Sequence, residues 1–79
     1  MNWQDRIIID PTILVGKPVI KGTRLSVQFL VGLLAEGWSN EDLLRNYPQL
    51  DLADIQAALH YASETLDRVR VIPMSNKFG

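Results

Sequence analysis

The sequence has 79 residues, enough for one small domain, and its 47% hydrophobic and 22% charged residues are typical of a folded globular protein. Cysteine is absent and the only histidine is His60, which leaves no disulfide, no cysteine–histidine pair and no two-histidine metal site, so we expect neither an enzyme nor a cofactor or small-molecule substrate. No apolar run is long enough to cross a bilayer and the first residues lack an export signal, so we expect a cytoplasmic protein without a membrane partner.

Charge is distributed unevenly along the chain, although the net charge is only -1. Residues 1–26 carry four basic and two acidic side chains, residues 27–67 carry one basic and seven acidic, and residues 68–79 carry three basic and no acidic. The basic ends either meet an acidic partner or belong to an ordinary solvated surface.

The first part of the chain predicts a β arm over residues 7–25. Ile7–Ile9 and Pro18–Ile20 are short β-branched runs, and the intervening residues 15–18 favour a turn. Two strands alone are unstable in water, so the arm must pack on helices or pair with a second copy of the chain. We expect a homodimer or higher homo-oligomer through this arm.

A first helix is predicted over about residues 27–36, with Ser26 as its N-cap and Gly37 just past its end. Apolar residues recur at helical spacing along it: Val27, Leu30, Val31, Leu34 and Ala35. Phe29 and Leu33 lie off that stripe, so the helix is either central or at an interface.

Two further helices are predicted over residues 40–46 and about 52–69. The second helix begins with a capping box of Ser39 and Asp42, and the third with Asp51 and Asp54 in capping positions, which explains these acids without catalysis. The apolar stripe predicted for the third helix consists of Leu52, Ile55, Leu59, Ala62, Leu66 and Val69.

The second and third helices, joined by a tight connection over residues 46–50, resemble a helix-turn-helix arrangement. In such a unit the later helix enters the DNA major groove, and the face opposite the apolar stripe contains Ala53, Gln56, Ala57, His60 and Ser63. Two acids at the start of that helix, with no basic residue before Arg68, are unfavourable for a phosphate backbone. Trp3 and Trp38 either cover the core or anchor an interface.

Several stretches form a known pattern: Ile9-Asp10-Pro11, Gly16-Lys17-Pro18-Val19-Ile20-Lys21-Gly22-Thr23-Arg24, Val27, Gly37-Trp38-Ser39, Tyr47-Pro48-Gln49-Leu50 and Asp54-Ile55. In these residues the sequence resembles the bacterial family called domain of unknown function 433. The resemblance implies a homeodomain-like three-helix core with an N-terminal β arm, and an antitoxin of the VapB type. Such an antitoxin is encoded beside a PIN-like ribonuclease toxin, inhibits it by direct binding and represses its own operon.

We therefore predict a mainly α fold, with a three-helix homeodomain-like helix-turn-helix core preceded by a short β-hairpin. It forms a single domain over residues 1–70, followed by a flexible tail over 71–79. A dimer would bind operator DNA, with phosphate contacts from Lys17, Lys21, Arg24 and Arg45, and with Gln49, Gln56 and His60 nearer the bases. The toxin would meet Arg68, Arg70, Val71, Ile72, Met74 and Phe78. The competing prediction is a protein-interaction or assembly module that binds no nucleic acid, which suits the acidic middle of the chain better.

Overall fold

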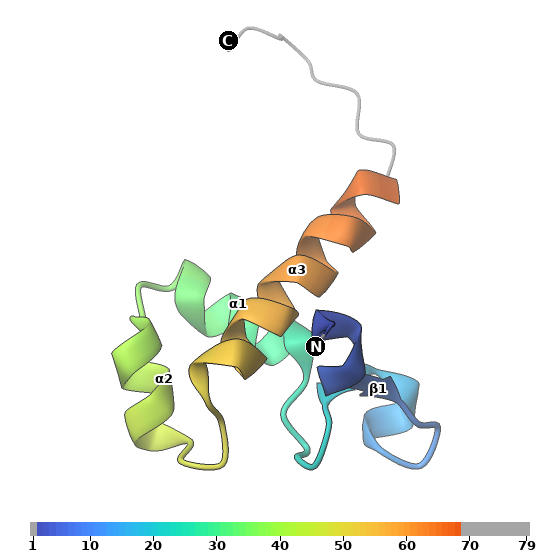
Figure 1. Cartoon of the computed structure of the whole chain (residues 1–79), viewed down its shortest axis with the longest axis horizontal. Helices are drawn as coiled ribbons and strands as arrows, with labels where there is room; N and C mark the ends of the chain where they lie inside the picture. Colours follow the sequence, from blue (N-terminus) through green and yellow to red (C-terminus); the bar gives the residue numbers. More distant parts are fainter. Residues whose placement is uncertain (1, 69–79) are drawn as a thin grey trace, which may run out of the picture.

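The computed structural model describes residues 2–68, and three α-helices dominate it (Figure 1). In chain order the elements are η1 (Trp3–Arg6), β1 (Ile7–Ile9), η2 (Leu14–Gly16), β2 (Pro18–Ile20), α1 (Val27–Ala35), α2 (Asn40–Asn46) and α3 (Leu52–Arg68), where η denotes a short 3-10 helix. The predicted mainly α fold with an N-terminal β-hairpin is confirmed. Over the described part of the chain, no helix combines the length and the apolar character needed to cross a membrane.

The β-hairpin packs on helices of its own chain. β1 pairs antiparallel with β2, so that Ile7 lies opposite Ile20 and Ile9 opposite Pro18. Val19 and Ile20 are fully buried, because β2 packs on α1 while β1 lies against η1 and α3. Of the two arrangements left open by the sequence, the structure shows packing on helices, and pairing with a second copy stays a prediction.

Side-chain caps fix where α1 and α2 begin. The hydroxyl of Ser26 accepts a hydrogen bond from the backbone N–H of Phe29 at 2.9 Å. Ser39 and Asp42 cap each other reciprocally, with donor–acceptor distances of 2.9 and 3.0 Å. Both predicted caps are confirmed, and each satisfies backbone donors that a helix start leaves without partners.

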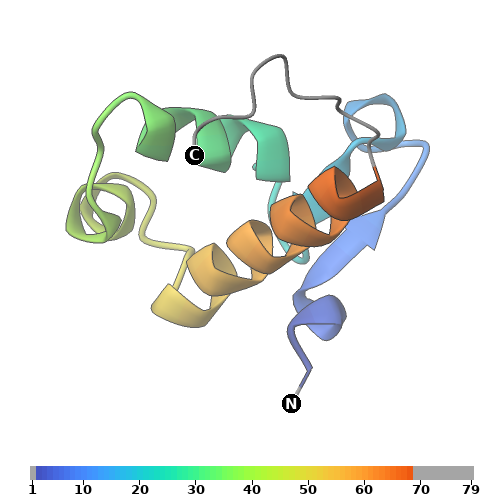
Figure 2. The same cartoon turned by 90° about the horizontal axis from the view of Figure 1, so that it is seen from above.

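The core lies where α1, α2 and α3 meet β2, and α2 and the hairpin lie on opposite sides of α3 in both views (Figures 1 and 2). Its buried members are Ile20, Val27, Leu30, Leu43, Leu50, Ile55 and Ala58. Trp38 is half-buried against this core and stacks on Tyr47 at 6.5 Å between ring centroids. Ala35, predicted to be on the core-facing stripe, is exposed.

The predicted orientation of α3 is wrong for its leucines. Leu52, Leu59 and Leu66 are 45%, 43% and 66% exposed, whereas Ala57, expected on the outward face, is fully buried. The small side chains of Ala57 and Ala58 face the core and let α3 pack closely, which turns the leucines outward. The C-terminal half of α3 also extends beyond the other elements (Figure 1).

Candidate functional site

The start of α3 is held by ion pairs that reach across the chain. Nη1 of Arg6 lies 2.9 Å from Oδ1 of Asp54 and 3.1 Å from Oδ1 of Asp51. The two carboxylates also cap the helix, because Asp51 accepts from the backbone N–H of Asp54 at 2.9 Å and Asp54 accepts from that of Asp51 at 3.0 Å. The predicted capping is confirmed, and Arg6 adds a positive charge beside it.

These contacts shift the pKa values of Asp51 and Arg6 in the directions that favour their charged forms. The hydrogen bond from the backbone N–H of Asp54, followed by the charge of Arg6, holds the pKa of the Asp51 carboxyl below its ordinary value. The hydrogen bond to Asp54 raises the pKa of the Arg6 guanidinium. Arg6 therefore stays a cation and offsets the negative charge at the start of α3.

Aromatic packing places η1 over part of the outward face predicted for α3. The rings of Trp3 and His60 stack with centroids 5.6 Å apart and an interplanar angle of 10°, and Trp3 meets Tyr61 edge to face at 6.5 Å. A hollow of about 350 Å³ lies here, lined by Trp3, Arg6, Ala53, Gln56 and His60. The structure thus brings Gln56 and His60 together, but beside residues of η1 instead of on an open helix face.

The four predicted phosphate contacts do not form one surface. Lys17 and Arg24 line the same groove beside α1. Lys21 lines a separate hollow with Asp5, Arg6 and Asp54. Arg45 lies 3.3 Å from Asp42 on α2, and Gln49 is exposed in the turn before α3. Only Lys17 and Arg24 share a site.

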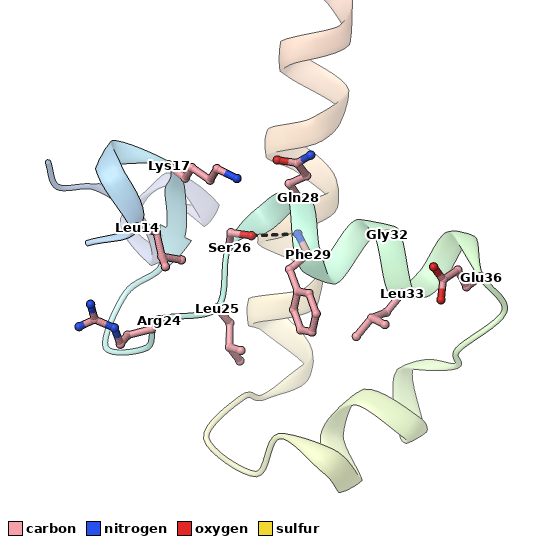
Figure 3. A pocket seen from close by; sticks show the side chains of 10 residues that line it. All are labelled: Leu14, Lys17, Arg24, Leu25, Ser26, Gln28, Phe29, Gly32, Leu33 and Glu36. Carbon is pink, nitrogen blue, oxygen red and sulfur yellow. Dashed lines mark hydrogen bonds between the residues drawn. The ribbon is translucent and has the colours of Figure 1, made fainter. Parts of the chain in front are cut away.

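The groove beside α1 has a volume of about 630 Å³ (Figure 3). Leu25, Phe29 and Leu33 point to the same side of α1, and Phe29 is 43% exposed although its ring contacts Tyr47 edge to face at 5.9 Å. The lining residues are Leu14, Lys17, Arg24, Leu25, Ser26, Gln28, Phe29, Gly32, Leu33 and Glu36.

One wall of this groove comes from a strained turn. Leu14 and Val15 of η2 adopt left-handed backbone conformations, with φ of 50° and 57°, which side chains disfavour and β-branched ones disfavour most. Val15 is 93% exposed, while the adjacent Leu14 lines the groove. The sequence predicted a turn here but not this conformation, which costs about 1–3 kcal/mol for a residue of this kind.

Gly32 lies in the interior of α1, where glycine is less stable than alanine by about 1 kcal/mol. A Cβ atom built on it would meet no atom of the described chain within 4 Å, and its φ is not positive. Neither packing nor backbone conformation therefore requires a glycine. A glycine inside a predicted helix can be identified from the sequence alone, so the unusual position of Gly32 is predictable.

The residues predicted to meet a toxin lie at or beyond the end of the described chain. Arg68 is the last residue of α3, and Arg70, Val71, Ile72, Met74 and Phe78 lie outside the described residues. On α3 itself the structure shows a partly exposed row of Leu52, Leu59 and Leu66. Within residues 2–68, no group of three histidine, cysteine or acidic side chains is placed to hold a metal ion.

No local sequence pattern predicts the role of Arg6, because its partners Asp51 and Asp54 lie 45 and 48 residues away.

The fold and its surfaces define a small helix-turn-helix-like domain with an N-terminal hairpin, and known proteins share it. Residues 7–62 match the family described as "Protein of unknown function (DUF433)", so this chain belongs to the DUF433 family, as the resemblance implied. A solved structure, of a DUF433 member protein from Anabaena variabilis, is 35% identical and superposes with a TM-score of 0.77 over 82% of this chain.

A curated relative, the uncharacterized protein y4eO of Sinorhizobium fredii, is 42% identical over 52 residues, or 66% of this chain. The chain spans 24% of the length of that relative and 64% of the Anabaena chain. The shared region therefore also occurs as part of longer proteins.

Proposed function

We propose that this chain is an antitoxin-like cytoplasmic regulator, which binds and inhibits a PIN-like ribonuclease toxin and, as a dimer, binds the operator DNA of its own operon. The exposed row of Leu52, Leu59 and Leu66 carries the proposal. These leucines recur every seven residues and stay partly exposed in the described chain, and the row leads toward Arg68, where the predicted toxin contacts begin.

The toxin meets this leucine row and the segment that follows it. The leucines bury apolar side chains of the toxin, and the basic residues Arg68, Arg70 and Lys77 pair with the acidic cluster expected of a PIN-like nuclease. Because the C-terminal half of α3 extends beyond the other elements, a partner can reach it without displacing the core (Figure 1).

Operator binding rests on α2, the turn after it and α3. Gln49 in the turn and Gln56 on α3 are exposed in the parts of the unit that read base edges, and Lys21 and Arg45 are the phosphate contacts of this proposal. His60 contributes through its stack with Trp3, so the reading surface includes η1.

The test is coexpression of this chain with the product of the adjacent reading frame, with an affinity tag on one of the two proteins. We expect copurification and rescue of growth, and both should be lost in the double variant Leu59→Glu/Leu66→Glu, which places charge in the leucine row. Thr65→Glu adds one negative charge at an exposed position of α3 outside the row and should change neither. Rescue that is unaffected by the double variant would contradict the proposed toxin surface.

A second candidate, a protein-interaction module that binds no nucleic acid, is favoured by the start of α3. Asp51 and Asp54 occupy the end of the helix that would approach DNA, and Arg6 is engaged with them instead of being free for phosphate. Binding to random duplex DNA at low and high salt separates the two candidates. The antitoxin proposal expects affinity that falls with salt, and the second candidate expects none.

A further inference from the structure

The groove beside α1 combines two chemistries at one site. Lys17 and Arg24 are exposed on either side of Leu14 at the end of the groove away from Glu36 (Figure 3), and neither belongs to an ion pair among the described residues. Leu25, Phe29 and Leu33 supply an apolar wall along the helix (Figure 3). A ligand that satisfies both parts must carry negative charge next to apolar groups.

Gly32 leaves room for a ligand to approach this wall of the groove closely. It is exposed in the groove, and no atom of the described chain occupies the space that a side chain there would fill. Glycine is among the least favourable residues inside a helix, and here nothing within the described chain uses its small size. The space above Gly32 is therefore available to the backbone of a ligand, since helices pack closer over small side chains.

We propose that this groove is a docking site for an acidic amphipathic helix of a partner protein. The apolar face of that helix packs on Leu25, Phe29 and Leu33, its backbone crosses over Gly32, and its carboxylates meet Lys17 and Arg24. A phosphodiester backbone would satisfy the two cations but would leave the exposed ring of Phe29 in water. The groove lies on α1, apart from the leucine row of α3, so this site goes beyond the proposed function and does not depend on it.

The partner is unidentified, so the probe is a phage-displayed library of helical peptides about 16 residues long, which matches the length of α1 with flanking turns. The library fixes leucine at helical spacing on one face and randomises the other positions. The full chain is the bait, and the enriched peptide is then synthesised for fluorescence polarisation. We expect enriched sequences with acidic residues clustered toward one end, because Glu36 repels them at the other.

Three variants locate the binding. Gly32→Gln fills the space above α1 and should weaken binding of the selected peptide at least tenfold. The melting temperature of this variant should not fall, because glutamine is a better helix former than glycine. The charge reversal Lys17→Glu/Arg24→Glu should weaken binding of the selected peptide similarly. It should favour a second peptide in which lysines replace the acidic residues. Ala35→Gln, exposed on α1 outside the groove, should leave affinity unchanged.

The outcomes that overturn the proposal are distinct. A library that yields no binder, or a binder indifferent to Gly32→Gln, shows that the groove does not take such a helix. If Gly32→Gln instead dissociates a dimer in sedimentation velocity, the groove is filled by a second copy of the chain. If it abolishes binding to random duplex DNA, the two cations serve nucleic acid.

Discussion

Replacing Asp54 by alanine tests whether the contacts at the start of α3 hold η1 in place. Asp54 is only 12% exposed in its side chain, and its two oxygens accept from the backbone N–H of Asp51 at 3.0 Å and from Arg6 at 2.9 Å. The substitution removes both acceptors together. It also leaves Arg6 with Asp51 alone, so the link between η1 and α3 weakens as well as the helix start.

The size of the effect follows from the burial of this carboxylate. Loss of a helix-capping acceptor costs about 0.5–2 kcal/mol, and Asp54 belongs at the upper end because its oxygens are largely shielded from water. We expect the free energy of unfolding to fall by about 2 kcal/mol. For a domain of this size, each kcal/mol lowers the melting temperature by about 4–8 °C, which predicts a decrease of about 8–16 °C.

Circular dichroism at pH 7 measures the melting temperature of Asp54→Ala against the wild type. Glu64→Ala, which removes an exposed carboxylate from the same helix, is the control and should change stability by less than about 0.5 kcal/mol. In NMR spectra, the Overhauser contacts between Trp3 and His60 should weaken in Asp54→Ala only. A melting temperature as close to wild type as that of the control would refute this account of the α3 start.

Two further predictions concern the core and acid stability. Leu43 is fully buried, so Leu43→Ala should lower the free energy of unfolding in urea by about 2–5 kcal/mol. The pKa values of Asp10, Asp42 and Asp51 lie below the ordinary value of 3.8, through hydrogen bonds from Thr12 for the first, from Ser39 for the second and from the Asp54 N–H for the third. Because the unfolded chain then binds protons first as pH falls, their stabilisation is complete above about pH 5 and is lost at lower pH, as urea titrations at pH 7 and pH 3 would show.

Local patterns were enough to predict the three α-helices and the two strands, but not η1 and η2. Ser26, Ser39 and Asp51 each offer an oxygen to a helix start, and the structure uses all three as caps. Ile7–Ile9 and Pro18–Ile20 form the two strands where β-branched runs predicted them. These predictions hold because helix caps and β-branched runs depend on residues that are close in the sequence.

The orientation of α3 and the location of the sites could not be predicted in the same way. Helical periodicity identifies an apolar stripe but does not say whether the core or a partner covers it, and on α3 the alanines face inward. The placement of Arg6 beside Asp51 and Trp3 over His60 depends on η1 returning to α3, which no short-range pattern encodes. Lys17 and Lys21, four residues apart at the two ends of β2, line different hollows, and no local pattern predicts this separation.

A helix needs one apolar stripe to pack in a small domain, and α3 has two. The inner stripe, with Ile55 and Ala58, is buried in the core, whereas the outer leucines are only partly covered by the described chain. On α1 the same division occurs, because Leu30 is buried while Phe29 stays in the groove. The exposed apolar surface on these two helices would add to stability if a partner covered it, because burial of apolar area is favourable. Two surfaces on separate helices can be covered at the same time, so the leucine row of α3 and the groove beside α1 can bind different partners, as the two proposals require.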